Sequence, residues 1–131
     1  MDIEQVAVFY NSINVDIITV KNFYTKLKKI CKCLKPVDIT NRREVSLFLE
    51  AMKKMKNIKN IFLINLGGDG SLFSSLSILA KTLETQKIHT ISFNFGNKGF
   101  YCFYPKNLLF DFLEDKINIM DIIKNDYEEE N

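Results

Sequence analysis

The chain of 131 residues is built from two alternating hydrophobic patterns. Short and nearly continuous apolar runs occupy residues 5–10, 61–66 and 87–93, and such runs are typical of parallel strands buried on both faces. Residues 37–39 are expected to form a further, brief strand. Between these runs, apolar residues recur every three or four positions at 20–34, 45–55 and 72–83, which predicts helices with one buried stripe. Pro36 is expected to end the first of these helices.

The order of these segments predicts the fold class. Strands and helices alternate as far as residue 93, and this alternation favours a parallel sheet with right-handed crossovers. Thr40 or Asn41 is expected to cap the second helix, and Glu44 lies three residues after Asn41 as in a capping box. Residues 107–123 are expected to form one or two short helices. We therefore expect an α/β fold in three layers, a Rossmann-like parallel sheet with helices on both faces. This domain is expected to span residues 1–124, with an acidic tail at 125–131.

Composition and charge argue against several classes of function. The 18 basic and 16 acidic residues nearly balance, so no nucleic-acid partner is expected. No apolar run approaches the ~18 residues needed to cross a bilayer, and the N-terminus lacks the basic start of a secretory signal. We expect a cytoplasmic protein with no membrane partner. Three cysteines and a single histidine form no zinc-binding pattern, so Cys31, Cys33 and Cys102 are interpreted as free thiols.

A glycine-rich loop, Gly67-Gly68-Asp69-Gly70, directly follows the central apolar run and precedes a helical pattern that begins at Ser71. Glycines tolerate positive φ and carry no Cβ, so the backbone N–H groups of this first loop are able to approach phosphate oxygens closely. Asp69 is the one charged side chain of the loop, and a carboxylate repels phosphate. We therefore expect Asp69 to face a hydroxyl group, a Mg²⁺ ion or the N-terminus of its own helix.

A second glycine-bearing loop follows the last apolar run. It contains Asn94, Gly96 and Gly99, and the aromatic residues Phe100 and Tyr101 come next. Ligands of parallel α/β sheets bind beyond the carboxyl ends of the strands. Because both loops lie at such ends, we expect them to face one site.

The two loops together resemble those of one enzyme family. The first is neither a Walker loop, which needs a following Lys and Ser or Thr, nor a GxGxxG dinucleotide fingerprint. It resembles the phosphate loop shared by NAD kinases, by diacylglycerol and sphingosine kinases, and by phosphofructokinases. The Asn-x-Gly-x-x-Gly-Phe pattern at 94–100 is similar to a segment of NAD kinases. The sequence therefore resembles the N-terminal α/β domain of the NAD kinase family.

The resemblance implies a phosphoryl transfer. NAD kinases move the γ-phosphoryl group of ATP, or in some members of polyphosphate, to the 2′-hydroxyl of the adenosine ribose of NAD, and thereby make NADP. By this resemblance, Asp69 holds and deprotonates that hydroxyl, and a Mg²⁺ ion accompanies ATP. The implied phosphate-binding turn consists of Gly67, Gly68, Gly70 and Ser71. The implied wall near the NAD adenosine consists of Asn94, Gly96, Gly99, Phe100 and Tyr101.

The resemblance also has a consequence for completeness. NAD kinases carry a second, largely β domain after this region, and this sequence ends at about the point where that domain is expected to begin. We expect the chain to be incomplete for catalysis alone, and to form a homo-oligomer or to associate with a missing C-terminal half. Two alternatives stay open: a non-catalytic nucleotide-binding module or regulatory subunit, and a reduced lipid kinase that acts on diacylglycerol or a sphingoid base.

Overall fold

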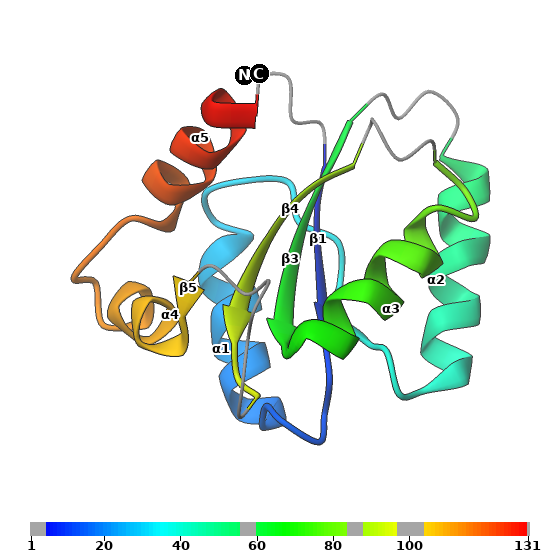
Figure 1. Cartoon of the computed structure of the whole chain (residues 1–131), viewed down its shortest axis with the longest axis horizontal. Helices are drawn as coiled ribbons and strands as arrows, with labels where there is room; N and C mark the ends of the chain where they lie inside the picture. Colours follow the sequence, from blue (N-terminus) through cyan, green and yellow to red (C-terminus); the bar gives the residue numbers. More distant parts are fainter. Residues whose placement is uncertain (1–4, 56–59, 84–87, 97–103, 131) are drawn as a thin grey trace.

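A five-stranded, all-parallel sheet forms the middle of the molecule (Figure 1). The computed structural model describes residues 5–55, 60–83, 88–96 and 104–130, with side chains described as far as residue 125. The strand order is β2-β1-β3-β4-β5. The strands are β1 (Gln5–Tyr10), β2 (Val37–Asp38), β3 (Ile61–Gly67), β4 (Ile88–Asn94) and β5 (Tyr104–Pro105).

Helices cover both faces of this sheet (Figure 1). One face carries α1 (Ile17–Leu27), α4 (Lys106–Leu113) and α5 (Ile119–Glu130), whose apolar residues share one core cluster. The other face carries α2 (Arg42–Lys54) and α3 (Asp69–Leu79), which share a second cluster. The predicted three-layer, Rossmann-like α/β fold is therefore confirmed.

The central strand β3 supplies both cores. All seven of its residues are buried. Phe62 and Ile64 pack in the cluster of α1, whereas Ile61 and Leu63 pack in the cluster of α2. Successive side chains of a strand point to opposite faces, so a strand covered on both sides is apolar at nearly every position. This burial explains the continuous apolar run that marks β3 in the sequence.

Helix α2 begins where the sequence predicts. The side chain of Asn41 accepts hydrogen bonds from the backbone N–H groups of Arg43 (3.1 Å) and Glu44 (3.2 Å), which satisfies two donors at the start of the helix. Glu44 does not complete the capping box in the expected way. Its Oε1 instead accepts a hydrogen bond from the backbone N–H of Asp38 at 3.3 Å, so it ties α2 to the edge strand β2.

The prediction of a first helix reaching residue 34 was wrong, because α1 ends at Leu27. The backbone N–H of Val6 donates to the carbonyl of Lys32, and the N–H of Leu34 donates to the carbonyl of Val6, both at 2.9 Å. Cys33 thereby forms a parallel bridge with Val6. Residues 32–34 thus extend the sheet edge beside β1, and Pro36 is not what ends the helix.

The C-terminal region also differs from expectation. The sequence did not indicate β5, which pairs Tyr104 with Phe93 and Pro105 with Asn94. Helix α5 runs from Ile119 to Glu130 and so includes most of the segment expected to be an acidic tail. Within the described residues, no helix offers an apolar stretch of the length that crosses a bilayer.

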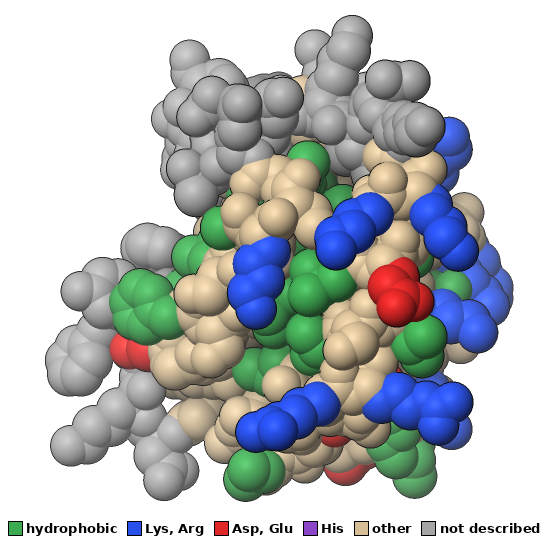
Figure 2. Space-filling model, turned by 90° about the vertical axis from the view of Figure 1, so that its right-hand side faces the viewer, with side chains coloured by type: hydrophobic (Ala, Val, Ile, Leu, Met, Phe, Trp, Pro, Cys, Tyr) green, Lys and Arg blue, Asp and Glu red, His purple; other side chains and the backbone are tan. Residues whose placement is uncertain are grey.

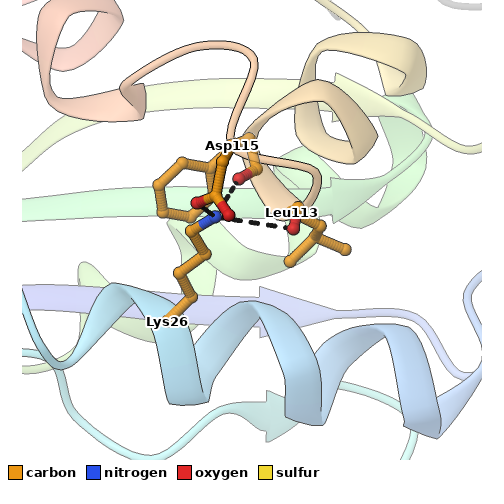
Figure 3. Close-up of polar contacts among 4 residues, drawn as sticks. Lys26, Leu113 and Asp115 are labelled. Carbon is orange, nitrogen blue, oxygen red and sulfur yellow. Dashed lines mark hydrogen bonds and ion pairs between the residues drawn. The ribbon is translucent and has the colours of Figure 1, made fainter.

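A single lysine joins α1 to the end of α4 (Figure 3). Lys26 Nζ donates to the carbonyl of Phe112 at 2.5 Å and to that of Leu113 at 3.5 Å, and it forms an ion pair with Asp115. The ammonium also lies 5.0 Å from the centre of the Phe112 ring. Asp115 has a φ of 62°, so the chain turns sharply just after α4. Lys26 thus adds a donor to carbonyls at the end of α4, where the Phe112 carbonyl also accepts a hydrogen bond from the backbone N–H of Asp115 at 3.2 Å.

Candidate functional site

The two predicted loops meet at the carboxyl ends of β3 and β4. Gly67 at the end of β3 is the register partner of Asn94 at the end of β4. The backbone N–H of Phe95 then donates to the carbonyl of Gly67 at 3.1 Å, which continues the pairing one residue beyond the strand. The two loops therefore begin side by side, at Gly67 and at residues 94–95.

The loops touch through glycines. A Cβ built on Gly96 would lie 3.3 Å from the Cα of Gly68 and 3.7 Å from its nitrogen. A Cβ on Gly68 would lie 3.8 Å from the Cα of Gly96. Side chains at Gly96 would therefore push the two backbones apart. The absence of a side chain there serves contact between the loops.

Gly67 allows α3 to begin close to the strand. A Cβ at this position would lie 2.6 Å from Ser71 Oγ and 2.8 Å from Ser71 Cβ, which real side chains do not tolerate. None of the described glycines has a positive φ. Gly67 is therefore needed for close packing, and the left-handed conformation plays no part in the described loops.

Gly70 differs from the other described glycines. A Cβ added there would meet nothing within 4 Å, and the residue is exposed in the first turn of α3. The packing of the fold therefore does not require a glycine at this position. The missing side chain leaves the surface beside Asp69 open.

Asp69 is the first residue of α3 and is half-buried. Gly68 is the N-cap and makes no side-chain capping hydrogen bond, so Asp69 is the first helical residue and not the N-cap itself. Its carboxylate lies in the first turn, where the helix dipole and the first N–H groups favour negative charge.

The second loop is held by its own asparagine. Asn94 Oδ1 accepts a hydrogen bond from the backbone N–H of Gly96 at 3.0 Å, which bends the chain directly after β4. This contact uses the acceptor of Asn94 within the loop. The predicted site residues Gly99, Phe100 and Tyr101 lie outside the residues that the structure describes.

Ser71, a predicted binding residue, is turned into the fold. Its side chain is buried, and its Oγ accepts a hydrogen bond from Asn11 Nδ2 at 3.2 Å. The Oγ of Ser75, one turn later, donates to the Ser71 carbonyl at 2.8 Å. The sequence analysis missed Asn11, which directly follows β1. Its contact with Ser71 was not predictable, because sequence alone does not reveal that β1 pairs with β3.

The sequence analysis also missed a buried polar pair beneath the loops. Asn65 of β3 is fully buried and donates from Nδ2 to Ser92 Oγ of β4 at 2.7 Å. The signal was present, since Asn65 is the one polar side chain in an otherwise apolar strand. It lies two residues before the first loop.

Metal ligands are sparse in the described part of the chain, where no group of three His, Cys, Asp or Glu side chains is arranged to hold an ion. Mg²⁺ commonly binds through one carboxylate together with substrate phosphates and water. Asp69, with open surface at Gly70, fits an ion that arrives with a nucleotide. It does not fit a cage made by the protein alone.

A mostly apolar hollow lies elsewhere on the molecule. A cavity of about 290 Å³ runs along α2 beside residues 34–37 and shares no residue with the two loops. Figure 2 shows the side of the molecule that carries α2 and α3, where apolar side chains in the middle are flanked by lysines and arginines. No protein-family model, no curated protein and no solved structure matches the chain. The loops at the carboxyl edge of the sheet therefore remain the best-supported candidate site.

Proposed function

We propose that the chain is an NAD kinase-like phosphotransferase domain. In this proposal it directs the phosphoryl group of ATP to the 2′-hydroxyl of the adenosine ribose of NAD. The observation that carries the proposal is the pairing of Asp69 with an open glycine. Gly67 and Gly96 are explained by packing, whereas Gly70 leaves room beside the one carboxylate of the loop. Such room suits a ligand that approaches the backbone of α3 closely.

Asp69 has the chemistry for this role. A ribose hydroxyl donates a hydrogen bond to a carboxylate. The carboxylate accepts the proton as the new oxygen–phosphorus bond forms and the bond between the γ-phosphorus and the ADP leaving group breaks. Phosphoryl transfer passes through a loose transition state, so positioning of the hydroxyl contributes most of the acceleration. General-base assistance adds a factor on the order of 10²–10⁴.

The neighbouring groups supply the surroundings of the reaction. The first N–H groups of α3 face the same edge of the sheet and favour anionic oxygens. ATP supplies the transferred phosphoryl group, and a Mg²⁺ ion bound with it would neutralise phosphate charge. Asn94 and Gly96 form the adjacent wall, on the side proposed for the NAD adenosine.

The proposal is tested by NADP formation from NAD, ATP and Mg²⁺, with wild type compared to Asp69→Asn and Gly70→Ala. Asp69→Asn keeps the shape but removes the proton acceptor, so we expect turnover to fall by roughly 10²-fold or more while NAD binding changes little. Gly70→Ala is expected to weaken nucleotide binding because its methyl group occupies the open surface. Equal losses of binding and turnover in Asp69→Asn would contradict the assigned role.

Two further results distinguish the alternatives. Nucleotide binding without turnover in wild type would favour the non-catalytic binding module. Phosphorylation of a diacylglycerol or sphingoid base instead of NAD would favour the lipid kinase. The loops at the carboxyl edge of the sheet are compatible with both alternatives, so the assay also includes a diacylglycerol and a sphingoid base as acceptors. The molecular mass of the active species is also measured. We propose that a second copy of the chain or a partner supplies further residues of the site, and the mass reports such an assembly.

A further inference from the structure

An asparagine interrupts the apolar interior of β3. Asn65 is fully buried, and its neighbours Ile64 and Leu66 are buried as well. It lies on the same face of the strand as Ile61 and Leu63, toward α2 and α3. An amide in such a place loses its hydration and must recover hydrogen bonds inside the protein. A leucine of similar size would fill the position without that requirement.

The hydrogen bonds of Asn65 only partly meet this requirement. Nδ2 donates to Ser92 Oγ at 2.7 Å and makes a longer contact of 3.5 Å with the Gly68 carbonyl. Oδ1 is buried and has no hydrogen-bond partner. The unsatisfied oxygen lowers the free energy of unfolding, and the packing around Asn65 does not explain why an asparagine occupies this position.

The position of the pair relates it to both loops. Asn65 and Ser92 are register partners, and each lies two residues before the last residue of its strand, Gly67 in β3 and Asn94 in β4. The Gly68 carbonyl also accepts the first hydrogen bond of α3, from the backbone N–H of Leu72 at 3.1 Å. One amide thus contacts the base of the second loop and the carbonyl on which α3 begins.

We propose that Asn65 is a positioning residue for the candidate site. Asn65 contacts both the Gly68 carbonyl and Ser92 of β4. It thereby fixes the position of the first turn of α3 relative to the end of β4. Asp69 directly follows Gly68, so the same contact sets the position of its carboxylate. The part of this inference that concerns catalysis rests on the proposed function, whereas the part that concerns the loop does not.

The test compares Asn65→Leu with a matched control, Thr90→Val. Thr90 lies on β4, two residues nearer the start of the strand than Ser92, and its Oγ1 is also buried without a hydrogen-bond partner. Both substitutions remove an unsatisfied polar atom from the same sheet. We expect both variants to unfold at or above the wild-type temperature. Amide hydrogen exchange of residues 68–72 is expected to rise about tenfold in Asn65→Leu only.

Catalysis provides the second measurement. A displaced Asp69 affects the chemical step more than the binding of NAD, so kcat for NADP formation is expected to fall about tenfold or more in Asn65→Leu. KM for NAD is expected to stay within about threefold of wild type. Thr90→Val is expected to change neither constant. Ser92→Ala, which removes the acceptor of the Asn65 amide, repeats the exchange test if Asn65→Leu does not fold.

Each outcome decides one part of the inference. Unchanged exchange at residues 68–72 in Asn65→Leu, or in Ser92→Ala where that variant replaces it, overturns the positioning role, whatever the activity. Faster exchange with unchanged kcat overturns the link to Asp69. Faster exchange in a protein whose wild type forms no NADP supports positioning of the loop and overturns the proposed function alone.

Discussion

A Cβ at Gly67 would lie 2.6 Å from Ser71 Oγ, whereas a Cβ at Gly70 would meet nothing within 4 Å. The two glycines belong to the same short loop in the sequence, but only one of the two positions excludes a side chain for steric reasons. The first belongs to the packing of α3 against β3, and the second lies on open surface. Only the second is therefore informative about a ligand.

This contrast predicts opposite effects on stability. Gly67→Ala is expected to destabilise the fold by about 1–3 kcal/mol, because Ser71 must move. Gly70→Ala is expected to stabilise it by about 0.5–1 kcal/mol, because alanine favours the helix and restricts the unfolded chain. Urea unfolding of the two variants beside wild type measures both changes. A loss of stability in Gly70→Ala would show that the glycine has a packing role.

Individual site residues were predictable to different degrees. The first loop and Asp69 follow from glycine spacing after a buried strand, and Asn94 follows from the same logic. The inward turn of Ser71 was not predictable, because it depends on Asn11 sixty residues earlier. Asn65 was visible as a polar residue in an apolar run, but its partner Ser92 required the register of β3 and β4.

Among the elements, α1 and α4 are joined by apolar packing, with the rings of Phe23 and Phe112 edge to face at 5.8 Å, and by a charged side chain at one end (Figure 3). Lys26 is 26% exposed and contacts carbonyls as well as Asp115, whose side chain is 84% exposed. An ion pair with so exposed a partner contributes little by itself. The carbonyl contacts at the end of α4 therefore account for most of the stabilisation by Lys26.

Lys26→Met tests this division. Methionine keeps the stem over Phe112 but loses the donors, so we expect a loss of about 1 kcal/mol and a fall in unfolding temperature of roughly 3–6 °C. Asp115→Asn, which removes only the ion pair, is expected to change stability by less than about 0.5 kcal/mol. Lys21→Met, an exposed lysine on the same helix, serves as the control. Equal effects of Lys26→Met and Asp115→Asn would assign the stabilisation to the ion pair.

Helix boundaries show what periodicity does not reveal. The apolar spacing of residues 20–34 fits a helix throughout, yet the backbone of residues 32–34 hydrogen-bonds to Val6 in β1. A long-range hydrogen bond thus overrides a local pattern. The strand β5 was missed for a related reason, since two residues carry no detectable period.

For the whole molecule, the half-buried thiol of Cys33 makes the free energy of unfolding depend on pH in the alkaline range. Burial, together with the nearby Cys31, raises the pKa of the Cys33 thiol to about 12. An unfolded thiol has a pKa of roughly 8.5, so between these values the unfolded chain releases a proton that the folded chain keeps. The free energy of unfolding therefore falls as pH rises, by about 1.4 kcal/mol per pH unit for each such thiol.

Cys33→Ala removes this contribution. We expect the unfolding free energy of wild type, measured in urea between pH 8 and pH 11, to fall more steeply than that of the variant. The difference between the two slopes isolates Cys33 from lysines and tyrosines that titrate in the same range. Parallel pH profiles would contradict burial of this thiol.

The sheet order could be predicted only as a class. Alternating strands and helices indicate a parallel sheet, but the sequence does not say that β1 lies between β2 and β3. That placement depends on side-chain packing of both cores, which periodicity along the chain does not encode.

The order β2-β1-β3 affects how the chain folds while the ribosome synthesises it. The register pairs Gln5 with Ile61 and Tyr10 with Leu66, so β1 completes its inner pairing only when residue 66 is available. At a synthesis rate of about 5–20 residues per second, β1 waits roughly 3–11 s for that partner. During this interval its apolar side chains lack their central neighbour, and the nascent chain is a natural client for a chaperone at the ribosome exit.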